Sequence, residues 1–281
     1  MIGFKKNSQS TGKFSLSIFT LVILFLYLPL LALVAYSFND GRMMNWTGFS
    51  FRWYNELFFN SSRLWSSFIN SLIVAISSAT VSTVIGTLGA VGLYWYRFKF
   101  RKVIRTVAFV PMLIPEIIIG VSLLIFFAGI GLQLSLFTVF IAHTTFNIPF
   151  VLMIVSARME SFDYFLIEAA YDLGAKERDV LSKVIMPAAF PGIISGFLIA
   201  VTLSLEDFVI TFFVSGPGSS TLPLHVYSMI RFGVSPVINA LSVVIIIITV
   251  ILALMSRNVV KYMFHDNNNN NNKPLSERSI L

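Results

Sequence analysis

Long runs of apolar residues recur along this chain, and they constrain its fold more than any other feature. Six runs stand at about residues 16–37, 67–95, 103–129, 134–157, 188–214 and 238–257. Each is long enough to cross about 30 Å of hydrocarbon as a helix, which takes about 20 residues. Because lipid cannot hydrogen-bond free backbone amides, each span must be helical. The sequence therefore predicts an all-α integral membrane protein with six transmembrane helices.

The composition agrees with a chain that meets little water. Only 12% of the 281 residues are charged, 56% are hydrophobic and the mean hydropathy is +0.82. Soluble domains carry about twice that share of charged residues. The membrane domain, residues 16–257, takes up nearly the whole chain, and the absence of cysteine excludes thiolate catalysis and cysteine-ligated metals. We expect a protein that is not an enzyme and that itself binds no metal or cofactor.

Basic residues between the spans predict the orientation. Sixteen of the 20 Lys and Arg lie near the termini or in the loops after the second and fourth spans, and four lie on the opposite side. By the positive-inside rule, both termini are then cytoplasmic. No basic face with interleaved aromatics is present, so nucleic acid is not an expected partner. Residues 1–15 form a cytoplasmic segment, and 258–281, with six consecutive asparagines, are expected to be a disordered cytoplasmic tail.

The one sizeable polar loop on the cytoplasmic side covers about residues 158–187. Its pattern predicts a short helix over 162–173, a stop at Gly174 and a second short helix over 176–184. Glycine suits a left-handed stop because it has no Cβ to clash there. Such a helix–turn–helix knob could insert into a partner's groove, or it could lie as an amphipathic loop on the membrane surface.

A motif in this loop resembles the EAA loop of the membrane permeases of ATP-binding-cassette (ABC) importers. The motif is Glu168-Ala169-Ala170, Gly174, Val184 and Met186-Pro187, with valine and methionine where the family has isoleucine and leucine. The resemblance implies the type I ABC importer permease fold and a coupling loop that docks on a dimer of ATP-binding subunits. The coupling residues it implies are Glu168, Ala169, Ala170, Leu173, Gly174 and Pro187. The chain lacks a G-x-x-x-x-G-K-[ST] phosphate loop, so ATP and Mg are expected in the partner ATPase.

Three carboxylates fall inside predicted spans: Glu116, Glu206 and Asp207. A charge at the bilayer centre costs about 2.5–3.5 kcal/mol, and no Lys or Arg lies deep within a span to pair with these acids. Pro111 and Pro115 predict a kink just before Glu116, of the kind tolerated where backbone lines a cavity. A path for a small organic polycation fits best. The alternative is that the acids are neutral and hydrogen-bonded between helices.

A polar patch in the fourth span is a weaker candidate for the same path. It consists of His143, Thr144, Thr145 and Asn147, near Pro149. These residues could line the path, but hydrogen bonding between helices explains them equally well. His143 has no second histidine at helical spacing, so a metal site is not expected.

Further stretches resemble the spermidine/putrescine importer permeases over roughly residues 20–255. They include Pro115-Glu116-Ile117, Thr202-Leu203-Ser204-Leu205-Glu206-Asp207 and Phe213-Val214-Ser215-Gly216-Pro217. Aspartate is more typical of that family where Glu116 and Glu206 stand. The resemblance implies the second of two paired permease subunits in the cell inner membrane, to which an extracytoplasmic binding protein delivers the polyamine. The predicted substrate path comprises Glu116, Glu206, Asp207, Ser204, His143 and Asn147.

Two other functions stay open at this point. The chain could be an importer permease for another solute, such as a ferric ion, a phosphonate or a different amine. It could also be a proton-coupled secondary carrier that uses the same acids as proton relays and needs no partner.

Overall fold

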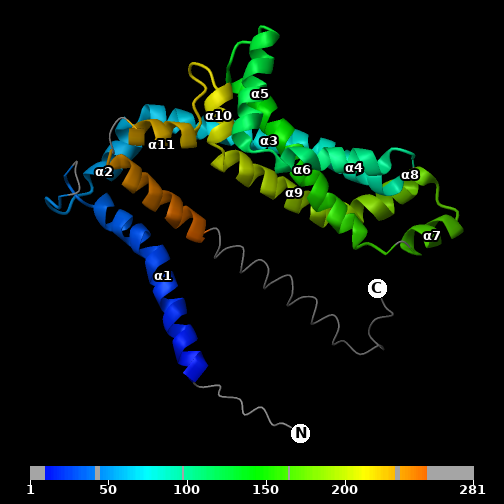
Figure 1. Ribbon diagram of the computed structural model, residues 1–281, viewed down its shortest axis with the longest axis horizontal. Helices are drawn as coiled ribbons and strands as arrows, with labels where there is room; N and C mark the ends of the chain where they lie inside the picture. The colour runs from blue at the N-terminus through cyan, green and yellow to red at the C-terminus, as the bar shows by residue number, and fades with distance from the viewer. Residues whose placement is uncertain (1–9, 42–44, 97, 164, 232–234, 252–281) are drawn as a thin grey trace, which may run out of the picture. The chain divides into compact units, whose positions relative to one another are not determined.

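The computed structural model describes residues 10–41, 45–96, 98–163, 165–231 and 235–251, and every regular element in these ranges is helical (Figure 1). The chain forms two compact units. One unit is residues 62–231, and the other combines residues 1–61 with 232–281. The all-helical expectation is confirmed for the described residues.

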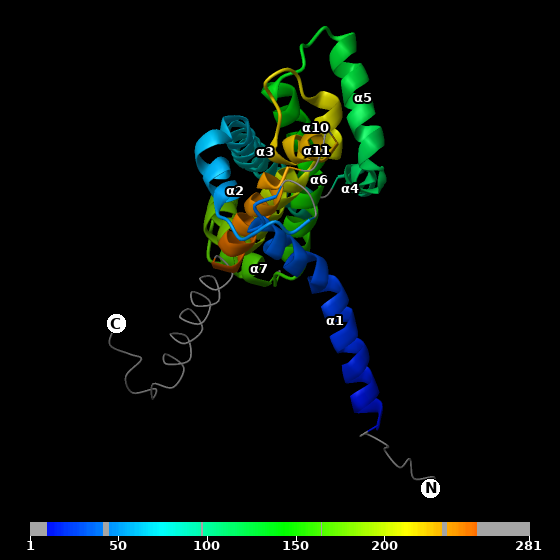
Figure 2. The same ribbon diagram turned by 90° about the vertical axis from the view of Figure 1, so that its left-hand side faces the viewer.

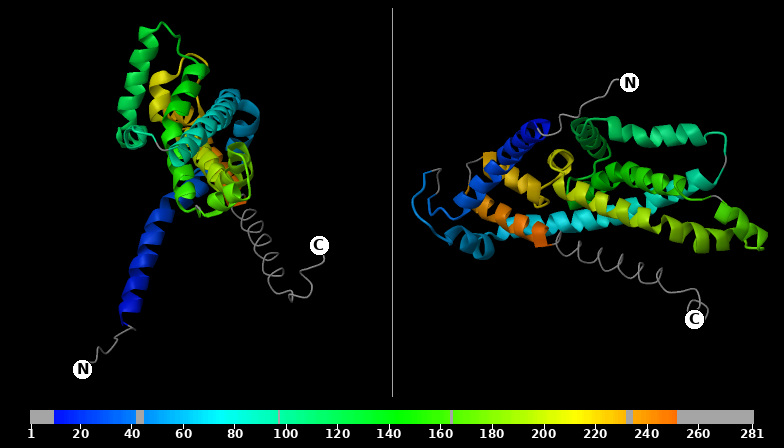
Figure 3. Two further views of the ribbon diagram at one scale, coloured as in Figure 1. Left: turned by 90° about the vertical axis from the view of Figure 1, so that its right-hand side faces the viewer. Right: turned by 90° about the horizontal axis from the view of Figure 1, so that it is seen from below.

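Three long helices form the centre of the unit 62–231. They are α3 (Ser62–Trp95), α6 (Leu136–Glu160) and α9 (Met186–Glu206), which run side by side (Figures 1 and 3). Small buried residues recur every three or four positions on α3: Ser67, Ser71, Ala75, Ser78, Ala79, Ser82, Gly86 and Ala90. A Cβ added to Gly86 would lie 2.8 Å from Val151 Cβ, so α3 and α6 approach closely there. Small residues allow such contact where lipid supplies no hydrophobic drive between helices.

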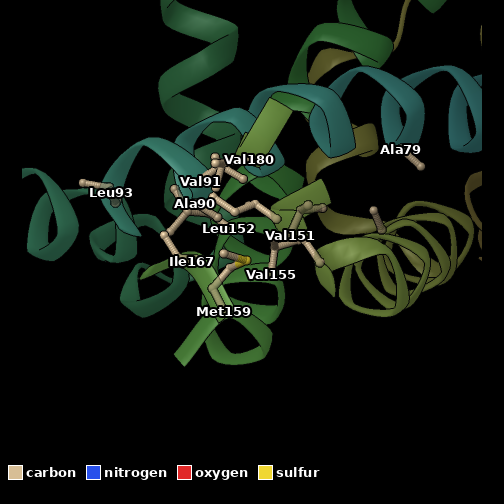
Figure 4. Close-up of a cluster of buried hydrophobic side chains, with 13 residues drawn as sticks. Ala79, Ala90, Val91, Leu93, Val151, Leu152, Val155, Met159, Ile167 and Val180 are labelled. Atoms are coloured by element: carbon tan, nitrogen blue, oxygen red, sulfur yellow. The ribbon is translucent and has the colours of Figure 1, made fainter. Parts of the chain in front are cut away.

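Two clusters of buried apolar side chains hold this unit together. Figure 4 shows the first, in which Val151, Val155 and Met159 of α6 meet Ile167 and Val180 of the polar loop. The second joins α3, α6 and the helices around residues 116–129 and 209–214. Its buried members are Val74, Phe127, Val139, Ala142, Phe146, Ile210 and Val214. The first cluster anchors the polar loop, and the second packs the helices around residues 116–129 and 209–214 against α3 and α6.

The third predicted span is sharply bent. It consists of α4 (Arg101–Phe109), the 3₁₀ turn η2 (Val110–Leu113) and α5 (Glu116–Gly129), and the chain bends by 101° between its two arms (Figure 2). Neither Pro111 nor Pro115 can donate a backbone hydrogen bond, and two such losses within five residues favour a break in the helix here. The kink expected from these prolines is confirmed.

The polar loop and the fifth span also differ from the sequence expectation. After α7 (Phe165–Asp172), α8 (Glu177–Val180) continues through the π-helical turn η3 (Leu181–Ile185) into α9. A separate helix ending at residue 184 was therefore the wrong expectation. Pro187 stands in the first turn of α9, where the missing backbone N–H of a proline is tolerated. The π-helical turn η3 joins α8 to α9 just before this proline, so the helix is continuous.

At its other end, the fifth span breaks instead of running on to residue 214. Asp207 has extended backbone angles, φ −63° and ψ 125°, and a new short helix α10 (Val209–Val214) follows. A further helix, α11 (Leu222–Arg231), follows α10. The acidic pair Glu206 and Asp207 therefore stands at a helix break.

The second unit contains α1 (Ser10–Ser37), α2 (Arg52–Asn55), the π-helical turn η1 (Glu56–Asn60) and an apolar helix over Val237–Ile251. Trp53 of α2 holds the segment that follows α1: its buried indole donates from Nε1 to the carbonyl of Asn39 at 2.6 Å.

Four described helices are long and apolar enough to cross a membrane: α1, α3, α6 and the helix over Glu177–Glu206. The bent pair Arg101–Leu113 and Glu116–Gly129 makes a fifth only if its two arms together form one span. The described part of the last predicted span, residues 237–251, is shorter than a full crossing. Residues 252–257 and the predicted tail 258–281 lie outside the described residues, so the count of six spans stays a prediction.

Candidate functional site

The helix break at Asp207 is the most polar feature within the helices of unit 62–231. The Asp207 side chain turns back onto the first turn of α10. Its Oδ1 accepts from the backbone N–H of Ile210 at 3.2 Å, and its Oδ2 accepts from the N–H and the hydroxyl of Thr211 at 2.9 and 2.7 Å. A carboxylate so placed caps a helix and faces the positive end of its dipole. Asp207 is buried, and it stabilises the break.

His143 of α6 binds both sides of this break. Its Nδ1 lies 2.6 Å from Ser204 Oγ on α9, and its Nε2 lies 3.1 Å from Asp207 Oδ2 and 2.9 Å from Thr211 Oγ1 on α10. The His143 side chain is fully buried. Of the sequence patch, only His143 takes part in this hydrogen-bonded network, which we call the buried network: His143, Ser204, Asp207 and Thr211. Thr144 and Thr145 instead donate within α6 to the carbonyls of Phe140 and Ile141, each at 2.8 Å.

Asn147 lies one turn further along α6 and is also fully buried. Its Nδ2 donates to the Ala200 carbonyl at 3.3 Å, and its Oδ1 has no partner among the described residues. Asn147 is thus a helix–helix contact with one acceptor still free.

The other two acids of the predicted path are exposed on this chain. Glu206 is the last residue of α9, and Glu116 is the first residue of α5, directly after the proline bend. Glu116 lies within electrostatic range of both Asp207 and Glu206. Within the described ranges, no Lys, Arg or His side chain lies at ion-pair distance from either glutamate. The structure thus gathers the three acids at two helix breaks and leaves two of them unpaired.

Aromatic side chains beside these acids were not assigned from the sequence. Phe208 follows Asp207, and its ring centroid lies 4.5 Å from that of Tyr227 on α11. Phe212 of α10 contacts both rings, at 5.7 and 6.4 Å. The one sequence signal for this group is a phenylalanine directly after an acid pair. Tyr227 is distant in sequence, so only the packing of α11 brings it here.

The polar loop folds around Gly174 as a Schellman motif. The N–H of Gly174 donates to the Tyr171 carbonyl at 2.8 Å, and the N–H of Ala175 donates to the Ala170 carbonyl at 3.0 Å. Gly174 has φ +82°, the left-handed conformation that this helix end requires. The predicted glycine stop is confirmed.

The polar loop has an anchored face and a free face. Ile167 is buried in the first apolar cluster, whereas Leu173 is 89% exposed. Glu168 and Ala169 are exposed beside it, Ala170 is half-buried and Pro187 is exposed at the start of α9. An apolar side chain held outward on a firmly packed helix is suited to a protein contact.

The end of α3 is tied to this loop through one carboxylate. Glu177 Oε1 accepts from Trp95 Nε1 at 3.2 Å and from the Tyr96 hydroxyl at 3.0 Å. The hydrogen bond to Glu177, with the negative charge of that carboxylate, raises the pKa of Tyr96 above its ordinary value. These contacts join the polar loop to α3, one of the three central helices of the unit.

Among the described residues, no group of three or more His, Cys, Asp or Glu side chains is arranged to hold a metal ion. The acidic and polar groups instead divide into the buried network and the two unpaired glutamates.

Comparison with known proteins places this arrangement in a family. Residues 82–265 match the family described as binding-protein-dependent transport system inner membrane component. The chain is 42% identical over 227 residues to the spermidine/putrescine transport system permease protein PotC of Escherichia coli K12, covering 80% of this chain and 86% of that protein. It is 40% identical over 229 residues to the putrescine transport system permease protein PotI of the same organism, covering 79% and 81%.

Solved structures with this fold include ABC transporters. A bacterial alginate ABC transporter in complex with its pentasaccharide-bound periplasmic protein aligns with a TM-score of 0.71, at 17% identity over 92% of this chain and 96% of that chain. The methionine ABC transporter MetNI aligns with a TM-score of 0.57, at 19% identity over 71% and 93%. The fold is that of ABC importer permeases, and the chain belongs to the family of binding-protein-dependent transport system inner membrane components.

Proposed function

We propose that this chain is the membrane-spanning subunit of an ATP-driven importer that moves polyamines, such as spermidine and putrescine, into the cytoplasm. The observation that carries the proposal is the acidic cluster, in which Glu116 and Glu206 are exposed and unpaired within the described chain. An uncompensated charge in hydrocarbon costs about 2.5–3.5 kcal/mol for each carboxylate. A water-filled path carrying a cation removes that cost, whereas an anionic cargo would be repelled.

A polyamine matches both kinds of group at the break. Its ammonium groups complement carboxylates on two different helices, Glu116 of α5 and Glu206 of α9. The faces of Phe208 and Tyr227 can attract the same cation through their ring quadrupoles. The cargo of the two named relatives, spermidine or putrescine, supports this class of solute.

The exposed face of the coupling loop supports the energy source. We infer that Glu168, Ala169 and Leu173 dock on one subunit of an ATPase dimer, which holds ATP and Mg. A second, homologous permease subunit completes the path, and an extracytoplasmic binding protein delivers the polyamine. In this arrangement both termini and the coupling loop lie in the cytoplasm, as the distribution of Lys and Arg indicates.

The proposal is tested by polyamine uptake into proteoliposomes that contain the whole complex, its binding protein and internal ATP. The double variant Glu116→Gln, Glu206→Gln keeps the side-chain shapes and removes both charges, so uptake should fall about tenfold or more. The matched control, Glu116→Asp with Glu206→Asp, keeps the charges and should retain most of the uptake. Normal polyamine uptake by an assembled double glutamine variant would refute the cation path.

The same preparation separates the rival functions. Binding of a ferric ion or a phosphonate, and not of polyamines, by the cognate binding protein would assign a different cargo. Uptake by the purified chain alone, driven by a pH gradient without an ATPase, would assign a proton-coupled carrier.

A further inference from the structure

The two neighbouring acids of the fifth span have different surroundings. Asp207 is buried and accepts hydrogen bonds on both oxygens, whereas Glu206 is exposed and accepts none from the described residues. Asp207 has left the helix, and its carboxylate turns back onto Ile210 and Thr211 of α10, so it is not presented together with that of Glu206. The sequence alone gave no reason to choose between them.

The hydrogen-bond roles in the buried network follow from the partners of His143. A carboxylate can only accept, so the Nε2 that faces Asp207 carries the hydrogen. Thr211 donates its hydroxyl hydrogen to Asp207 and presents its oxygen to the same Nε2–H. In the neutral ring, Nδ1 accepts from the Ser204 hydroxyl. Each group then has a partner, and one imidazole on α6 holds α9, the break and α10 together.

We propose that His143 is a positioning residue that fixes the Asp207 carboxylate as the cap of α10, so that Asp207 maintains the helix break and only Glu206 of the pair meets the cargo. The assignment of Glu206 rests on the proposed function, but the role of His143 does not. Without the ring, the Asp207 carboxylate would lose a buried donor and the start of α10 would open more often.

The direct test is hydrogen–deuterium exchange of the peptide containing Ile210 and Thr211, measured on the intact complex in detergent. His143→Leu removes both ring nitrogens at similar volume and should accelerate exchange in this peptide about tenfold or more. His143→Gln keeps a donor near the position of Nε2 and should restore slow exchange. If His143→Leu does not fold, Thr211→Val, which removes only the bridging hydroxyl, should accelerate the same exchange.

The roles of the two acids are compared with the matched variants Glu206→Gln and Asp207→Asn, each of which removes one charge and keeps the side-chain shape. Glu206→Gln should lower uptake several-fold and leave exchange within about twofold of the wild type, whereas Asp207→Asn should accelerate exchange. If His143 acts through Asp207, adding His143→Leu to Asp207→Asn should change exchange little further.

Three outcomes would overturn the proposal: unchanged exchange in His143→Leu, equal exchange in the leucine and glutamine variants, or fully additive effects in the double variant. Failure of polyamine uptake alone would count against the proposed cargo and leave the exchange result standing. Normal charge-dependent uptake with unchanged exchange would remove the role of His143 alone.

Discussion

Replacing Gly174 should weaken the coupling between ATP hydrolysis and transport. Gly174 has φ +82°, and no described atom lies within 4 Å of a Cβ built on it. The cost of an alanine there is therefore backbone strain without a clash, about 1–2 kcal/mol for an L-residue in the left-handed region. That free energy changes a local equilibrium by a factor of about 5–30. The Schellman motif at the end of α7 should then open, and the free face around Leu173 should lose its fixed orientation.

The chain offers a matched control for this strain. Gly131, between α5 and α6, has φ +70° and equally open space among the described atoms. Gly131→Ala should therefore carry the same backbone cost at a site away from the coupling loop. Gly174→Asn should be milder than Gly174→Ala, because asparagine tolerates the left-handed region better.

The assay is the number of cargo molecules imported per ATP hydrolysed by the reconstituted complex. We expect the ratio to fall several-fold in Gly174→Ala, less in Gly174→Asn and not at all in Gly131→Ala. An unchanged ratio in Gly174→Ala, or an equal loss in Gly131→Ala, would refute the link between this helix stop and coupling.

Two further predictions concern stability. Gly86→Ala forces a Cβ to within 2.8 Å of Val151, whereas Gly92→Ala on the same helix meets no described atom within 4 Å. Both variants gain helix propensity, so Gly86→Ala should have the lower free energy of unfolding in detergent, by the overpacking cost of about 1–3 kcal/mol. Equal free energies of unfolding would contradict the close packing of α3 and α6. Burial, with the nearby charge of Arg63, lowers the pKa of His225 below its ordinary value of 6.5. As the pH falls, the His225 imidazole is protonated more readily in the unfolded chain than in the folded one, so the free energy of unfolding should fall below about pH 6.5. A series of thermal-unfolding measurements at decreasing pH should show a smaller loss of stability in His225→Gln than in the wild type.

Local sequence determined much of this protein. Apolar runs longer than a bilayer crossing can only be helices in lipid, and α1, α3 and α6 follow those runs closely. Prolines before Glu116 fixed the bend of the third span because they lack the amides that a helix needs. Gly174 fixed the helix stop because other residues resist a positive φ. Each of these features depends on the chemistry of a few neighbouring residues.

Tertiary structure decided which polar side chains are buried and hydrogen-bonded and which are left exposed. Glu206 and Asp207 are adjacent and chemically alike, yet one is exposed and the other caps α10 under His143, which lies some sixty positions earlier. Tyr227 joins the same break only because α11 packs against it. Sequence periodicity marks which side of a helix is polar, but it cannot say which distant helix will supply the partner. Hydrogen bonding and burial depend on that partner, so only the packed chain distinguishes a structural acid from one left open to cargo.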